Sequence, residues 1–302
     1  MIALLAAGMC TPLGPQTVAA AAIRAGLSRA RQLDDGPLLG VGEDAHPPVG
    51  HQVLATGDAA TRHAGLLEHA WTELAVAPAC DLALLCTALN DPRRHSPDMT
   101  AEGPDLCGLR PRLLPLGHAG PAAALVEAER AIATGARQVL VGAVETRLDP
   151  SSLAWLAHDD RLRGPETPDG LQPGEGAAWW LLGRADARDA LALVNARHQP
   201  GDGRRSPAIL AQRLSSLEPG PTPNHWIDLT GEPWRARAWG TLLPQLPMRP
   251  EIVHPDLWGD LGAAAALCAA TCALHGGGTV WALGEDGGVG LIEVRPVPAE
   301  RG

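Results

Sequence analysis

The sequence contains no lysine, phenylalanine or tyrosine, and all 24 of its basic residues are arginine. Without lysine, no ε-amino group is available to act as a base or to form a Schiff base. Without phenylalanine and tyrosine, the nine tryptophans must supply the large aromatic packing. We therefore interpret Trp179-Trp180 as core residues on a strand and not as a ligand cage.

Signals for nucleic acid, membrane and metal are also missing. The formal net charge of −10 and the pI near 5.5 argue against nucleic acid as a partner. No hydrophobic run reaches the roughly 18 residues of a membrane span, and the apolar start at Met1 lacks the basic region of a signal peptide. The six cysteines form no C-x-x-C pair, so we expect a cytoplasmic protein with reduced thiols and no metal or other cofactor.

Apolar strands alternate with helices along the 302 residues, which is typical of α/β folds with mostly parallel sheets. The expected helices cover residues 17–25, 61–74, 121–134, 206–214, 235–243 and 261–274. The expected strands cover residues 2–6, 82–87, 113–116, 138–141, 177–182, 191–196, 225–229, 251–254, 279–283 and 289–294.

The most informative segment covers residues 112–146 and predicts a strand, a tight turn, a helix and a second strand. An apolar stripe supports the helix, and Gly135 suits its C-terminal cap. A side chain on the turn before this helix lies where backbone N–H groups are free. Enzymes that form acyl intermediates place their nucleophile at such a turn, but here the turn carries His118 and neither cysteine nor serine.

Several motifs resemble those of β-ketoacyl synthases of the thiolase superfamily. They are the spacing of Ala124-Leu125, Ala128, Ile132 and Gly135, the runs 11–14, 141–144, 259–264 and 284–294, and Asp-Gly-Leu-Gln-Pro-Gly-Glu-Gly-Ala-Ala at 169–178. The resemblance implies a duplicated αβαβα layered α/β fold, with an N-terminal half at 1–185 and a shortened C-terminal half at 186–302. It also implies a two-fold dimer formed through the strand near 138–141.

The same resemblance assigns the positions of the catalytic residues. The family's cysteine position holds His118, its first histidine position holds Thr230, and its second histidine or asparagine position holds Asp260. The family's lysine has no counterpart. Thiolate attack needs a cysteine of lowered pKa, and decarboxylation needs donors for the enolate oxygen. The resemblance therefore implies a protein without condensing activity.

Other roles for these residues remain open at this point. One role for His118 is that of a nucleophile or general base. The other is structural or vestigial, and it is favoured because a helix N-terminus disfavours a protonated imidazole. Glu175, between Gly174 and Gly176, is interpreted as part of a structural turn, with a buried acid as the alternative. Thr230 and Asp260 would bind a small polar ligand if a remnant pocket persists.

The run Asp228-Leu-Thr-Gly-Glu232-Pro-Trp-Arg235 to Trp239 is also similar to one in cysteine-free ketosynthase-like proteins of type VI secretion gene clusters. Locally, Glu232 and Arg235 predict a helix cap with an ion pair. The similarity implies an accessory or adaptor subunit for effector loading. If His118 is vestigial, we expect function to reside on the long, proline-rich surface loops 40–57 and 90–111. The alternatives are an acyltransferase or hydrolase with a non-cysteine nucleophile, and a silent subunit paired with an active ketosynthase. If the chain binds an acyl-carrier protein, the candidate contacts are the arginine-rich segments at 93–94, 110–112 and 161–163.

Overall fold

The computed structural model describes residues 1–34, 36–76, 79–89, 110–220, 222, 224–245 and 255–297. The expected strand at 251–254 and all but the end of the loop at 90–111 lie outside these ranges. The described strands are β1 (Ile2–Cys10), β2 (Arg31–Gln32), β3 (Val49–Gly50), β4 (Leu82–Cys86), β5 (Arg112–Leu114), β6 (Val139–Thr146), β7 (Glu175–Gly183), β8 (Ala192–Gln199), β9 (His225–Trp226), β10 (Gly278–Leu283) and β11 (Val289–Pro296).

The described α-helices are α1 (Gln16–Arg24), α2 (Ala59–Leu74), α3 (Gly120–Ala133), α4 (Pro150–His158), α5 (Pro207–Ser215), α6 (Pro233–Leu242), α7 (Pro255–Trp258) and α8 (Ala265–Cys272). Each expected helix is therefore present, with its ends shifted by a few residues. The sequence-based assignment missed α4, which begins at a proline and is capped by the Asp149 carboxylate through the Ser152 N–H.

Nine of the described strands form one sheet in the order β5-β4-β6-β7-β1-β8-β11-β10-β9. In the group β5-β4-β6-β7-β1, only β7 runs antiparallel to its neighbours. In the group β8-β11-β10-β9, only β11 does so. The two groups meet where Ile2 to Leu4 of β1 pair with β8. In each group all strands but one therefore run in the same direction, which is the mostly parallel arrangement that the alternation of strands and helices predicted.

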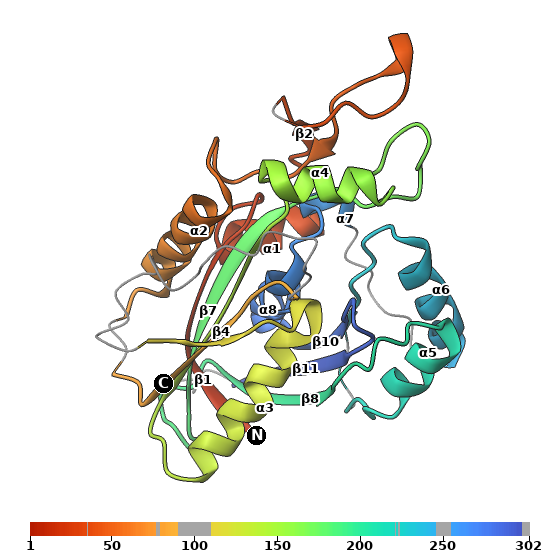
Figure 1. Cartoon of the computed structure of the whole chain (residues 1–302). Helices are drawn as coiled ribbons and strands as arrows, with labels where there is room; N and C mark the ends of the chain where they lie inside the picture. Colours follow the sequence, from red (N-terminus) through yellow and green to blue (C-terminus); the bar gives the residue numbers. More distant parts are fainter. Residues whose placement is uncertain are drawn as a thin grey trace.

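The helices complete a layered arrangement of the two strand groups (Figure 1). Helix α2 covers the outer face of the first group, with Leu66, Leu67 and Ala70 in its core. Helices α3 and α8 contact strands of both groups and form the layer between them. Helices α5 and α6 cover the outer face of the second group around Trp239 and Trp281. This order of layers confirms the predicted thiolase-like α/β class.

The middle layer depends on small residues. Every residue of α8 except Ala265 is buried, and most of them are alanine or cysteine. A helix that is apolar on all sides is stable only when it is enclosed, and small side chains let it approach two sheets. None of the helices in the described part of the chain has the length and apolar composition of a membrane span.

The prediction that the strand near 138–141 forms a dimer edge is wrong. That strand is β6, and it is hydrogen-bonded to β4 on one side and to β7 on the other. All eight of its residues are buried. A strand paired along both sides has no free N–H or C=O groups for a second chain. The continuous run Val139 to Val141 reflects burial inside the sheet and not an interface.

Candidate functional site

His118 lies where the sequence predicted, on a single turn of 3₁₀ helix (Gly117–Ala119) that leads into α3. The β5 strand delivers the chain to this turn from one side of the sheet. The imidazole is only 1% exposed, because the turn lies beneath the ends of β10 and α8. The predicted turn before α3, which we call the elbow (residues 117–119), is therefore present, but the His118 side chain does not face solvent.

Both ring nitrogens of His118 are occupied. Its Nε2 lies 2.8 Å from Oδ1 of Asp260, and its Nδ1 lies 3.0 Å from Nη2 of Arg235. A guanidinium can only donate, so Nδ1 must accept and the ring proton must be on Nε2, which donates to Asp260. Buried partners therefore engage both nitrogens of the ring. In this arrangement His118 has neither a free nucleophilic nitrogen nor a free basic one.

Arg235, in the first turn of α6, holds the imidazole and is itself completely buried. Its Nη1 donates to Oδ2 of Asp228 at 2.5 Å and to the carbonyl of Leu283 at 2.6 Å. Asp228 also accepts from the Trp239 indole N–H at 3.2 Å and from the Leu283 N–H at 2.8 Å. Burial raises the pKa of Asp228, although the Arg235 charge opposes this. The run 228–239 thus folds into one unit around Arg235.

The predicted helix cap at Glu232 is not observed as such. Glu232 occupies the N-cap position of α6, but its side chain makes no capping hydrogen bond. One carboxylate oxygen accepts from Nε of Arg161 at 2.8 Å, and the other lies 3.6 Å from Nε of Arg235. The predicted ion pair between Glu232 and Arg235 is therefore present, but its N–O distance is long. The shorter contact, with Arg161, links α6 to the segment after α4.

Asp260 anchors the other side of the imidazole. Its Oδ1 also accepts from the Gly262 N–H at 2.9 Å, and its Oδ2 lies 3.4 Å from Nη1 of Arg147. Burial would raise the pKa of Asp260, but Arg147 and His118 hold it well below its ordinary value. Asp260 is therefore a carboxylate, and its charge is balanced inside the protein.

Arg147 extends this cluster, although no sequence motif points to it. Its guanidinium lies 2.9 Å from Glu285 and 3.3 Å from Glu145, and Glu285 also accepts from Arg161 at 2.8 Å. Burial lowers the pKa of Arg147, but attraction to Asp260, Glu285 and Glu145 raises it well above its ordinary value. Arg147 and its partners lie up to 138 residues apart in the sequence, so no local sequence pattern predicts their contacts. Only the packing of the two strand groups brings them together.

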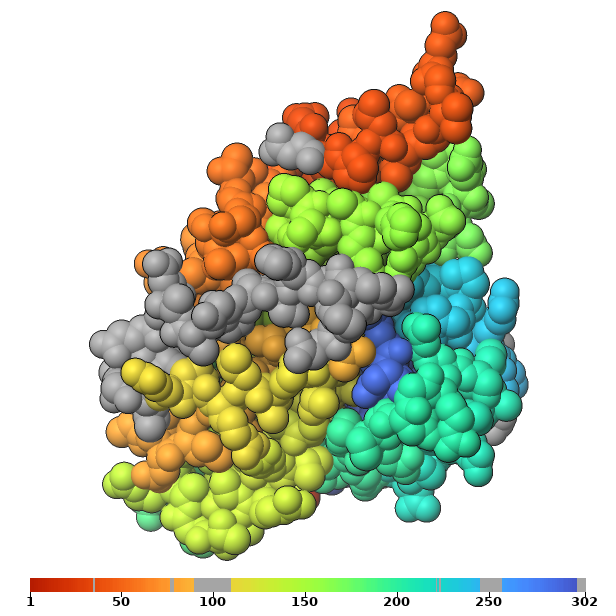
Figure 2. Space-filling view, viewed as in Figure 1, coloured from red at the N-terminus to blue at the C-terminus, as the bar shows by residue number. Residues whose placement is uncertain are grey.

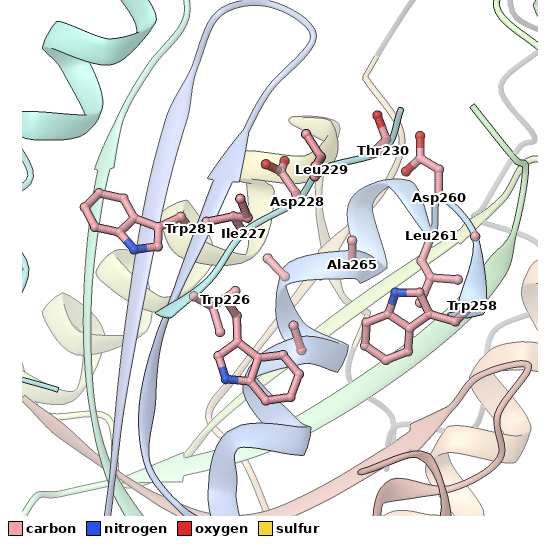
Figure 3. Close-up of a pocket in the computed structure, with 14 residues that line it drawn as sticks. Trp226, Ile227, Asp228, Leu229, Thr230, Trp258, Asp260, Leu261, Ala265 and Trp281 are labelled. Atoms are coloured by element: carbon pink, nitrogen blue, oxygen red, sulfur yellow. The ribbon is translucent and has the colours of Figure 1, made fainter. Parts of the chain in front are cut away.

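Thr230 completes the predicted set, and the structure brings all three positions together. Its hydroxyl is buried and has no hydrogen-bond partner in the described part of the chain. It lines a cavity of about 40 Å³ together with Asp260, beside the rings of Trp226 and Trp258 (Figure 3). That volume holds roughly three water molecules. The remnant pocket is therefore small, and α8 closes its apolar end through Ala265 and its neighbours.

Gly174 to Gly176 support the site from outside, and they do not form the predicted turn, since Gly174 bridges His51 and Glu175 begins β7. The Glu175 carboxylate is fully buried and accepts from the backbone N–H groups of residues 53 and 54 at 2.7 and 2.8 Å. Arg62 and the Thr146 hydroxyl donate to it at 3.0 Å. The Gly174 N–H donates to the carbonyl of Asp260 at 3.1 Å. Glu175 therefore ties the 50–57 segment to the sheet, and the Gly174 N–H positions the segment that carries Asp260.

No protein-family model matches the sequence, and a comparison with curated proteins finds no match. Solved structures do match its fold. The ishigamide ketosynthase/chain length factor aligns with a TM-score of 0.67 at 18% identity, covering 98% of this chain and 99% of that one. A type II polyketide synthase acyl-carrier protein in complex with its ketosynthase gives 0.71 at 16% identity, covering 98% and 99%.

The ketosynthase from module 6 of the bacillaene synthase of Bacillus subtilis 168 gives a TM-score of 0.70 at 12% identity, covering 98% of this chain and 72% of that one. At these identities the likeness is one of fold. The chain has the thiolase-like architecture of ketosynthases and chain length factors.

Proposed function

We propose that this protein is a ketosynthase-like protein without condensing activity, which works by binding as an adaptor or accessory subunit. One observation carries the proposal. At the elbow, where the family resemblance places a cysteine, His118 is buried with its Nε2 bound to Asp260 and its Nδ1 bound to Arg235. A side chain with both polar atoms occupied stabilises the fold and does not attack a thioester.

Thiol chemistry at the elbow has no other source among the described residues near it. Cys86, at the end of β4, packs against the first turn of α3, and its Sγ is within reach of Gly120. Burial raises the pKa of this thiol, and its residue is fully enclosed. A protonated, inaccessible thiol is a poor nucleophile. The two histidine positions hold Thr230 and Asp260, which supply no imidazole donor for an enolate.

The run 228–239 supports the finer proposal of a type VI secretion accessory role. Three residues that this run shares with the cysteine-free proteins of those gene clusters are Asp228, Arg235 and Trp239. They are the three that form the hydrogen-bonded unit holding Arg235 against His118. The shared residues thus form the hydrogen-bonded unit that binds His118 at the elbow. This arrangement suits a binding protein without acyl-transfer activity.

A silent subunit is the second candidate, and the likeness to chain length factors favours it. The ishigamide structure combines a ketosynthase with a chain length factor, and another matching structure contains an acyl-carrier protein. In this role the protein would pair with an active ketosynthase. Mixing experiments separate the two roles, because a silent subunit alters the product of its partner and a secretion adaptor does not.

The test of the shared claim is an acylation assay. The purified chain is incubated with acyl and malonyl thioesters and then examined by intact-mass spectrometry and product chromatography, beside an active ketosynthase as control. We expect no covalent adduct and no β-ketoacyl product. An adduct on any residue would overturn the proposal. An adduct on His118 would establish the acyltransferase alternative, and one on Cys107 would show a nucleophile outside the described residues.

A further inference from the structure

A narrow arm projects from the body of the protein above α4. We use "the arm" for residues 36–48, between β2 and β3. It is the orange-red segment that rises at the top of Figures 1 and 2. At its base, Leu33 and Leu39 pack with Leu148 and with Leu153 and Trp155 of α4. The arm is therefore anchored to the core at its base while its tip extends into solvent.

The arm is held in one shape by its own backbone. Leu39 and His46 exchange two hydrogen bonds of 2.8 and 2.9 Å across an antiparallel bridge. Gly40 has φ +93° where the chain turns, a conformation that other residues adopt only with strain. Three prolines, at 37, 47 and 48, restrict the backbone on either side of the bridge further. A segment fixed in this way loses little conformational entropy when a partner binds it.

The tip combines exposed apolar side chains with acidic ones. Val41 is 77% exposed and Leu38 is 66% exposed, more than any other large hydrophobic residue in the described ranges. Glu43 and Asp44 follow directly and are exposed as well. From residue 33 to residue 61 the sequence has five acidic residues and no lysine or arginine. The arm thus presents two exposed aliphatic side chains, Leu38 and Val41, together with two exposed carboxylates.

We propose that the arm is a docking element that inserts Leu38 and Val41 into an apolar cleft on a protein partner whose rim carries arginine or lysine. The aliphatic pair supplies the buried centre of such an interface, and Glu43 and Asp44 supply its polar rim. The exposed carboxylates of the arm favour a partner whose rim is basic. This inference rests on the proposed binding role and names the surface that performs it.

The first experiment identifies the occupant. A photo-crosslinking amino acid replaces Val41 in the full chain, expressed in the native organism. The matched control replaces Val18, an aliphatic residue of α1 that is 51% exposed. Mass spectrometry then identifies the crosslinked peptide. We expect a crosslink from position 41 and none from position 18, to a different protein and at a peptide that contains arginine or lysine. A crosslink to a second copy of this chain, or no crosslink specific to position 41, would overturn the proposal.

The second experiment measures the affinity of the purified pair. Leu38→Ser and Val41→Ser are each expected to weaken binding roughly tenfold, because each removes one buried aliphatic side chain. The control variant Leu27→Ser, at another exposed position, should leave the affinity unchanged. Changing Glu43 and Asp44 to glutamine should slow association and reduce its dependence on salt. An affinity unaffected by the arm variants would refute the docking role. The thioester assay tests the absence of condensing activity separately, so failure of one claim is distinguishable from failure of the other.

Discussion

Replacing Arg235 with methionine should remove much of the stability of the region that closes the elbow. The substitution keeps most of the side-chain volume and deletes the charge. It leaves the Asp228 carboxylate buried without its cation and leaves Nδ1 of His118 without its donor. Breaking a buried ion pair by removing one partner typically costs about 3–5 kcal/mol. For a chain of 302 residues, that cost corresponds to a melting temperature lower by roughly 5–8 °C.

The loss should depend on pH in a defined direction. Burial already raises the pKa of Asp228, and removing Arg235 removes the main charge that opposes this shift. Folded Asp228 then binds a proton at a pH where the unfolded chain has released it, so the stability of the variant falls as pH rises between the two pKa values. The deficit relative to the parent protein is therefore largest near neutral pH and shrinks as pH approaches the ordinary aspartate value of 3.8.

Thermal and urea unfolding, followed by circular dichroism from pH 4 to pH 8, measure both effects. Arg237→Met is the matched control, since Arg237 lies on the same helix but is exposed, and it should change stability by less than about 0.5 kcal/mol. The double variant Asp228→Asn/Arg235→Met should be less destabilised than Arg235→Met alone, because no charge is left unpaired. A cost below about 1 kcal/mol with no pH dependence would refute the role assigned to Arg235.

Three further outcomes follow from the site. His118→Ala should lower the free energy of unfolding by about 1–3 kcal/mol through the lost hydrogen bonds, while partner binding by the full chain remains intact; loss of binding at unchanged stability would argue for a functional histidine. Gly262→Ala should cost about 2–4 kcal/mol in urea unfolding, because Gly262 has φ +54° and an added Cβ would lie 2.1 Å from the Glu145 carboxylate; a neutral effect would mean that this loop is placed differently. Burial raises the pKa of Cys272 to about 12, so in the native protein at pH 8 iodoacetamide should modify the partly exposed Cys80 and spare Cys272 until the chain unfolds.

Much of the fold was predictable from the sequence because its signals are local. The helices at α2, α3 and α5 follow from apolar periodicity and from caps such as Asp58 and Ser206. The strand β6 was also found, but its role was not. A continuous apolar run indicates burial on both faces and gives no information on whether the strand edges are paired. The neighbours β4 and β7, which close both edges, are set by tertiary structure.

The candidate site divides in the same way. The sequence by itself determined the elbow, the residue that occupies it and the absence of lysine, since a turn before a helix places His118 without reference to the rest of the chain. Only the tertiary structure decided that Asp260 and Arg235 bind its two nitrogens and that Arg147 balances Asp260. The reason is physical: the protonation pattern of an imidazole and the cost of a buried charge depend on partners more than a hundred residues away, and these meet only when the two strand groups pack together.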